Sequence, residues 1–284
     1  MVGANYSQKG FGINASAKYV DNMDFRSDRT ANGTVSLLNF LPPITRQHTY
    51  LLMAFYPYAT QNRGEIGAQG EVFYKFQKGT ALGGKYGTEI AVNFSKVHGL
   101  DTVTTTAYEG YKAEPGKFGK ELYFQDFNVE LTKKFSKHFK SVLTYANIKY
   151  NIDIVQGLVG MGSVNCHIAV ADLTYSINDK YSLRTELQNM TVEKNLDRGS
   201  WAAALLEFSV APKWFFSVID QYNYGNPYHK ARVHYLMGQV TYVKDANRIA
   251  LSYGRQREGI LCVGGVCRNV PAANGFTLSV SSSF

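Results

Sequence analysis

The sequence predicts an all-β protein, an antiparallel β-barrel that spans a membrane, and three observations lead to this prediction. Apolar residues recur with a period of two, which is the period of a strand rather than of a helix. The alternating segments run for roughly 10–15 residues, whereas soluble strands have about 5–6 and a tilted strand needs about 9–11 to cross a bilayer. Short turns alternate with longer loops along the chain, as they do in outer-membrane barrels.

Five segments show the alternation, at 71–77, 89–95, 142–154, 181–188 and 276–284. In each of them, one set of alternate residues is mostly apolar and is expected to face lipid. The other set is polar along all or part of the segment and is expected to face the interior of the barrel. The predicted lumen-lining residues are polar side chains of these segments together with Arg255: Glu71, Lys75, Glu89, Asn93, Lys149, Asn151, Asp153, Arg184, Glu186, Gln188 and Arg255.

The connections determine how many strands we expect. Predicted turns on one side lie at 7–10, 41–46, 78–86, 136–138, 178–180, 211–213 and 244–247. Predicted loops on the other side lie at 23–31, 59–63, 101–120, 157–163, 195–200, 225–229 and 258–274. This division predicts about fourteen strands between Gly10 and Phe284. Because Gly3 to Tyr6 resemble the end of a strand, we expect further strands upstream, so that residues 1–284 form one domain and part of a larger barrel.

Aromatic residues favour the membrane interpretation. Tyrosine and tryptophan concentrate at membrane–water interfaces, and several lie near the predicted strand ends: Tyr56, Tyr58, Tyr108, Tyr111, Trp201, Trp214, Tyr222, Tyr224 and Tyr228. The alternative is the ordinary enrichment of aromatic residues in strands. A soluble all-β protein is accordingly the lesser interpretation.

Composition excludes several other classes of protein. With 18% charged residues, 20 Tyr and 17 Phe among 284 residues, the chain is not intrinsically disordered. No stretch of about 18–20 apolar residues without charges is present, so no transmembrane helix is predicted. The N-terminus lacks the apolar core of a signal peptide, which fits either an intracellular protein or a processed or truncated piece. The net charge of +8 comes from scattered basic residues, so we expect no nucleic-acid binding.

Few residues carry recognisable chemistry. Cys262 and Cys267 flank Val-Gly-Gly-Val in the last loop, where two glycines permit the reversal of a small disulfide ring, and we predict that they pair. Cys166 is interpreted as a small packing residue. The six histidines are dispersed without a metal-binding motif, and no local motif marks a nucleophile with its base. We therefore expect no catalytic residues, no metal, no cofactor and no enzymatic activity.

Two sets of segments carry a family resemblance. The ending GFTLSVSSSF resembles the last strand of bacterial outer-membrane barrels, whose terminal residue, here Phe284, belongs to the signal read by the assembly machinery. The segments YSQKGFGINASAKYVDNMDFRSDR, LPPITRQHTYLLMAFYPYATQ, KGTALGGKYGTEIAVNFS and YGRQREGILCVGGVCRNVPAANGF resemble an uncharacterised outer-membrane barrel family of Bacteroidota. This resemblance spans nearly the whole chain. It implies a location in the bacterial outer membrane, and it implies no catalytic residues because no activity is settled for the family.

Two functions remain open from the sequence. The first choice is a pore or uptake component, because mixed charges can line a wet channel. The runner-up is a closed barrel that acts as a scaffold or partner subunit, in which the same charges pair across a filled interior. A mitochondrial porin is a further alternative, against which the cysteine pair and the terminal Phe284 argue. The expected partners are outer-membrane lipid and lipopolysaccharide, the barrel-assembly machinery during biogenesis, and other envelope proteins.

Overall fold

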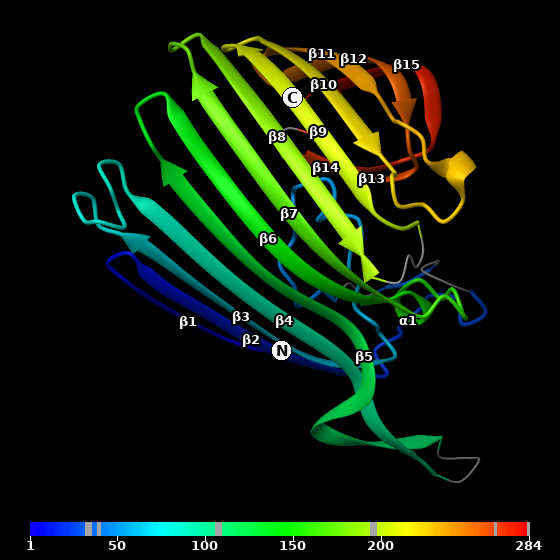
Figure 1. Cartoon of the computed structure of the whole chain (residues 1–284). Coiled ribbons are helices and arrows are strands. Elements are labelled where there is room, and N and C mark those ends of the chain that lie inside the picture. Colours follow the sequence, from blue (N-terminus) through cyan, green and yellow to red (C-terminus); the bar gives the residue numbers. More distant parts are fainter. Residues whose placement is uncertain (32–35, 39–40, 106–109, 194–197, 264–265, 283–284) are drawn as a thin grey trace.

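The computed structural model contains one antiparallel sheet that curves around a concave face (Figure 1). It describes residues 1–31, 36–38, 41–105, 110–193, 198–263 and 266–282, and the side chains at 259–269 lie outside this description. Thirteen strands of the described part form the sheet, in the order of the chain from β1 to β12 and then β15. The all-β antiparallel fold predicted from the sequence is confirmed.

The first half of the sheet contains β1 (Val2–Gln8), β2 (Phe11–Asp21), β3 (Gly64–Phe76), β4 (Thr88–Thr104), β5 (Tyr111–Lys134) and β6 (Phe139–Asn151). The short helix α1 (Ile152–Val155) leads into β7 (Ser163–Ser176), β8 (Tyr181–Val192), β9 (Trp201–Val210) and β10 (Trp214–Tyr222). After the 3-10 turn η2 (His229–Ala231) come β11 (Met237–Lys244), β12 (Asn247–Gln256) and β15 (Ala273–Ser282). A separate hairpin pairs β13 (Gly259–Val263) with β14 (Val266–Val270) between β12 and β15.

The pairing register divides the side chains between the two faces of the sheet. Residues that oppose each other on neighbouring strands share a face, and successive residues of a strand alternate. Asn93, for example, opposes Glu71 and Asn128 on the concave face. Leu206 opposes Thr185 and Val218 on the other face, which we call the outer face. The sheet is therefore polar over much of its concave side.

The outer face carries a wide apolar surface. We call these exposed side chains the outer belt: Val72, Tyr74, Phe94, Leu143, Tyr145, Leu187, Leu206, Phe216, Val218, Val240, Ile249, Leu251, Tyr253, Phe276, Leu278 and Val280. Their exposed fractions reach 50% for Leu187 and 77% for Phe276. A contiguous apolar surface of this kind marks a site that contacts lipid or protein rather than water.

The segment between β2 and β3 differs from the expectation. The predicted connections at 23–31, 41–46 and 59–63 left room for strands near 32–40 and 47–58, and residues 32–35 and 39–40 lie outside the described part. Residues 41–63 form turns and irregular backbone, so the second of these strands is wrong. We call residues 41–61 the interior segment, because it packs against the concave face. Ile44, Leu51 and Leu52 are each at most 1% exposed.

Tyr56 and Tyr58 belong to the interior segment, so their expected position near a membrane interface is also wrong. Tyr56 lies against Tyr150 with ring centroids 5.3 Å apart, and Tyr58 stacks on Phe124 at 5.0 Å. The physical reason is that an apolar segment buried by tertiary packing needs no regular secondary structure.

The other connections lie where the sequence predicts them, but some of them contain strands rather than irregular loops. The predicted loop at 101–120 is largely a hairpin, since β4 and β5 continue past the sheet and project from it (Figure 1). The predicted loop at 258–274 contains β13 and β14. Within the described residues, no helix is both long and apolar enough to cross a membrane.

Candidate functional site

The interior segment is held to the concave face by three polar contacts, and the first is a buried ion pair. Lys18 Nζ on β2 lies 2.7 Å from Glu65 Oε1 on β3, with side chains 3% and 0% exposed. The same ammonium donates to the Pro42 carbonyl and to Thr60 Oγ1, both at 2.8 Å. It thereby connects both ends of the interior segment to the wall.

Glu65 completes this first contact. Its Oε2 accepts hydrogen bonds from the Tyr58 hydroxyl and the Gln61 backbone N–H, each at 2.6 Å. Burial and the adjacent carboxylate raise the pKa of Tyr58 far above its usual value, so its hydroxyl remains a donor. A buried carboxylate needs such donors, because its own desolvation is costly.

The second contact joins the interior segment to β5. Arg46 donates to Asn128 Oδ1 at 3.1 Å and to Glu130 Oε2 at 2.7 Å. His48 Nε2 lies 2.7 Å from Asp126 Oδ2, and the Asp126 side chain is fully buried. These wall residues share the concave face because Asp126, Asn128 and Glu130 are two positions apart in one strand.

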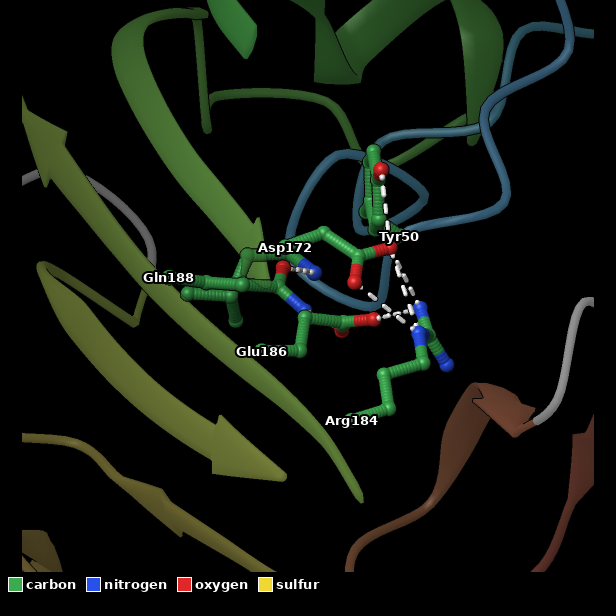
Figure 2. Close-up of polar contacts among 6 residues, drawn as sticks. Tyr50, Asp172, Arg184, Glu186 and Gln188 are labelled. Atoms are coloured by element: carbon green, nitrogen blue, oxygen red, sulfur yellow. Dashed lines mark hydrogen bonds and ion pairs between the residues drawn. The ribbon is translucent and has the colours of Figure 1, made fainter. Parts of the chain in front are cut away.

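The third contact lies on β7 and β8, and Figure 2 shows its residues converging. Arg184 bridges two carboxylates, with Nη2 at 2.9 Å from Asp172 Oδ2 and 2.5 Å from Glu186 Oε2. The Gln188 amide donates to Glu186 and accepts from the Leu52 backbone N–H at 2.8 Å. The Tyr50 hydroxyl donates to Asp172 at 3.3 Å. A guanidinium that satisfies both acids allows them to lie side by side.

At the end of the sheet where the predicted longer loops lie, which we call the loop side, apolar packing adds to these polar contacts. Leu51, Leu52 and Met53 join a buried cluster with Ile148, Ile168 and Met190 of the wall. Burying side chains of this size contributes about 1.5–3 kcal/mol each. Between the interior segment and β5 a cavity of about 420 Å³ remains, lined by residues that include Arg46, His48 and Phe124.

Most of the predicted lumen residues lie on the concave face. Those whose register places them there are Glu71, Lys75, Glu89, Asn93, Arg184, Glu186 and Gln188. The structure brings the last three together in one cluster. Lys75 and Glu89 form a separate exposed pair at 3.5 Å, and Asn93 accepts from Gln69 at 2.8 Å.

Lys149, Asn151 and Asp153 are corrections. Lys149 opposes Gln125 and Asn165 on the outer face, because Ile148 and Tyr150 on either side of it turn toward the interior segment. Asn151 instead caps α1 by accepting from the Ile154 N–H. Asp153 accepts the backbone N–H groups of Met161 and Gly162, both at 2.8 Å. Arg255 lies over the Tyr235 ring at 4.9 Å, and that ring lies 5.9 Å from the ring of Trp201, so the interior position of Arg255 stays a prediction.

Most of the residues that hold the interior segment were not predicted from the sequence, namely Lys18, Arg46, His48, Glu65, Asp126, Asn128 and Glu130. One signal was available, because Asp126, Asn128 and Glu130 alternate with Phe127, Val129 and Leu131. No local signal links Lys18 to Glu65, which is 47 positions away along the chain.

The two loop cysteines remain a prediction. Cys262 directly opposes Cys267 in the register of β13 and β14, although their side chains lie outside the described part. The backbone pairing supports a disulfide, since opposed strand positions bring Cβ atoms to about 4.5–5.5 Å. Phe284, the predicted assembly signal, lies outside the described residues. Within the described residues no three metal-ligating side chains gather.

A count of free thiols tests the disulfide. In denaturant without reductant, we expect the chain to offer one thiol of its three, that of Cys166, and all three after reduction. Alkylation followed by mass spectrometry measures both states. The variant Cys166→Ala is the control and should show no free thiol before reduction. Three reactive thiols in unreduced protein isolated from an oxidising envelope would exclude the pair.

Comparisons with known proteins place the chain in a sequence family and add little beyond it. Residues 1–284 match a family whose description reads "Family of unknown function (DUF6029)". No curated protein matches the chain significantly. One similar solved structure is titled "KdgM porin", with 9% sequence identity and a TM-score of 0.30, covering 67% of this chain and 86% of that chain. A similarity of this size carries no argument about function.

Proposed function

This chain belongs to the family of unknown function DUF6029, and we propose that it is a barrel component for uptake across the bacterial outer membrane. In this proposal the outer belt faces lipid, and the interior segment closes the passage along the concave face. The observation that carries it is the inverted polarity of the sheet. Exposed leucine, valine and phenylalanine side chains cover the outside, while carboxylates, amides and Arg184 line the inside.

The inversion supports a bilayer because water and hydrocarbon demand opposite arrangements. A soluble sheet buries its apolar face, whereas a membrane barrel turns that face outward and keeps its polar groups inside. Toward the loop side the pattern reverses, with Lys149 outside and Ile148 inside. This reversal fits a strand that leaves the bilayer and enters the aqueous phase.

The interior segment supports a closed passage rather than a permanently open pore. It occupies the concave side and is held by ion pairs and hydrogen bonds to β2, β3, β5, β7 and β8. Such contacts can exchange for water or for a solute when the segment moves. A scaffold that never transports is the competing function, and conductance separates the two.

An arginine substitution tests whether the outer belt faces lipid. Leu206→Arg is expected to lower the free energy of unfolding by about 2–4 kcal/mol, the cost of a charge near the bilayer midplane. Reversible urea unfolding in lipid vesicles measures this value. Thr191→Arg, on the outer face near the loop end of β8, is the matched control and should change it by less than about 1 kcal/mol. Equal small losses would contradict lipid contact, because a water-exposed leucine tolerates this change.

Loosening one contact of the interior segment tests the closed passage. Arg46→Ala removes the hydrogen bonds to Asn128 and Glu130. We expect channel openings in planar bilayers to become about tenfold more frequent, since a charged hydrogen bond contributes about 1.5–3 kcal/mol. Arg63→Ala is the control, because Arg63 is 86% exposed and pairs with Asp24 of the same connection. Frequent openings in the unaltered protein, unchanged by Arg46→Ala, would contradict the proposal.

A further inference from the structure

The hairpin turns of the sheet carry a row of lysines. The hairpins that join β1 to β2, β3 to β4, β5 to β6, β7 to β8, β9 to β10 and β11 to β12 all turn at one end of the sheet, which we call the turn side (Figure 1). Residues 8–11, 77–87, 133–140, 177–180, 211–213 and 244–247 form these turns with the strand ends beside them, and they contain ten lysines, at least one in each. We call these ten side chains the lysine rim. All of them are exposed except Lys133, which is half-buried, and the same stretches contain two carboxylates, Asp179 and Asp245.

The turn between β5 and β6 concentrates this charge. Lys134 directly opposes Lys140 in the register of the two strands, and Lys137 lies in the turn between them. Like charges in opposed strand positions destabilise a hairpin. An anionic surface in contact with the turn offsets this repulsion, because it supplies the opposite charge from outside the chain.

A row of aromatic rings lies beside the lysine rim on the outer face. Trp214 opposes Tyr242 there, two positions before Phe216 of the outer belt, and Phe139 opposes Tyr175 on the same face. Trp214 is 42% exposed and Tyr175 is 50% exposed. Tyrosine and tryptophan concentrate where hydrocarbon meets water. The row therefore marks the boundary of the outer belt on the turn side, and the lysines lie just beyond it.

Two lysines of the rim rest on rings at this boundary. Lys133 Nζ lies 5.6 Å from the centre of the Phe135 ring, and Lys180 Nζ lies 5.4 Å from that of Tyr181. Long lysine side chains cover apolar surface with their methylene groups and keep the ammonium group in a polar layer. At the end of an apolar belt, that polar layer is the headgroup region of a membrane.

We propose that the lysine rim binds the phosphate groups of anionic phospholipids in the membrane leaflet on the turn side. The ammonium groups reach the phosphates from the turns, while the aromatic row contacts the upper part of the acyl chains. This inference rests on the proposed membrane position of the outer belt, and it names the class of lipid that the turn side contacts.

The shape of the lysine rim favours a lipid surface over an acidic protein. From the first turn to the last, the rim follows the curved edge of the sheet across ten strand spacings, or about 48 Å. A standard protein interface covers about 800 Å² on each partner, which is a compact patch rather than a long narrow band. A headgroup layer meets the whole edge at one depth, as the even distribution over six turns requires.

Spin-labelled lipids test the preference for a phosphate headgroup. The full chain is reconstituted in phosphatidylcholine bilayers with a trace of labelled phosphatidylglycerol or labelled phosphatidylcholine of the same acyl chain. Electron paramagnetic resonance measures the fraction of each lipid whose motion the protein restricts. At low salt we expect phosphatidylglycerol to associate about fivefold more strongly, the contribution of one lysine close to an anionic headgroup. In 1 M salt, where the screening length is about 3 Å, the preference should disappear. Equal restriction of the two lipids at low salt would overturn the proposal.

Charge variants assign this preference to the turn side. Changing Lys78, Lys137, Lys213 and Lys244 together to glutamine should reduce the preference to less than about twofold. The matched control changes Lys112, Lys117, Lys120 and Lys230, four exposed lysines beyond the other end of the sheet, and should keep it. Labelled phosphatidylcholine should associate equally with all three proteins, which shows that the variants are folded and inserted. A preference that survives the first change, or that both changes abolish equally, would contradict binding at the lysine rim.

An acidic protein is the competing partner, and soluble polyglutamate represents it. Tight binding of polyglutamate to the chain in detergent, together with equal restriction of the two labelled lipids, would assign the rim to such a partner and refute the proposal. The lipid measurement also separates this inference from the proposed function. If phosphatidylcholine is restricted without a preference for phosphatidylglycerol, the headgroup assignment alone fails. If neither lipid is restricted, the membrane position of the outer belt fails with it.

Discussion

Replacing Lys18 with methionine is expected to lower the free energy of unfolding by about 3–5 kcal/mol, because it leaves a buried carboxylate without its counter-charge. Glu65 is fully buried and lies 2.7 Å from the Lys18 ammonium. The same change deprives the Pro42 carbonyl and the Thr60 hydroxyl of their shared donor. Reversible urea unfolding of the reconstituted full chain measures the loss.

The chain offers a matched control for Lys18→Met. Lys75 pairs with Glu89 across β3 and β4 at 3.5 Å, but these side chains are 56% and 48% exposed. Lys75→Met should therefore cost less than about 1 kcal/mol. The double variant Lys18→Met/Glu65→Leu should recover part of the loss, because no charge stays buried. If the double variant is as unstable as Lys18→Met, the loss of stability comes from the altered side-chain shape and not from the unpaired buried charge.

Replacing residues 44–58 with a glycine–serine linker of equal length is expected to convert a closed protein into a conducting one. The change removes Arg46, His48, Tyr50 and the buried Leu51–Met53 stretch in one step, while Pro42 and Thr60 still meet Lys18. A flexible linker has no apolar surface with which to hold the concave face. Steady single-channel current in planar bilayers, absent from the unaltered chain, is the expected result.

The control for this variant replaces residues 79–86, the exposed connection at the opposite end of β3 and β4, with a linker of equal length. It should remain closed. A silent variant at 44–58 would favour the structural scaffold over the uptake component. Equal current through the unaltered chain would show that the interior segment does not close the passage.

Strands were predictable from the sequence wherever one face of the strand has the same surroundings along its whole length. The segments that became β3, β4, β8 and β15 alternate along their length, so their strand character and their polar faces follow from local pattern. The Glu186–Gln188 stretch illustrates this, since both residues lie on the predicted interior side. The prediction of which residues face the interior can hold for one part of a strand and be wrong for another, as in β6.

In β6 the alternation is regular, yet the apolar set changes its role along the strand. Leu143 and Tyr145 lie on the outer face, while Ile148 and Tyr150 lie on the concave face. Extending one phase of the pattern through the whole segment placed Lys149 inside, which is wrong. The cause is the interior segment, which turns the loop side of the concave face into an apolar core.

The amino-acid sequence alone determined the strand class, most of the connections and the existence of one apolar and one polar face, because these depend on side chains two positions apart. Only the tertiary structure decided where residues 41–61 lie and which charges meet. Lys18 with Glu65, and Tyr50 with Asp172, are brought together by contacts between distant parts of the chain. Such pairings depend on how the sheet curves around the segment, and alternation within a single strand carries no information about that curvature.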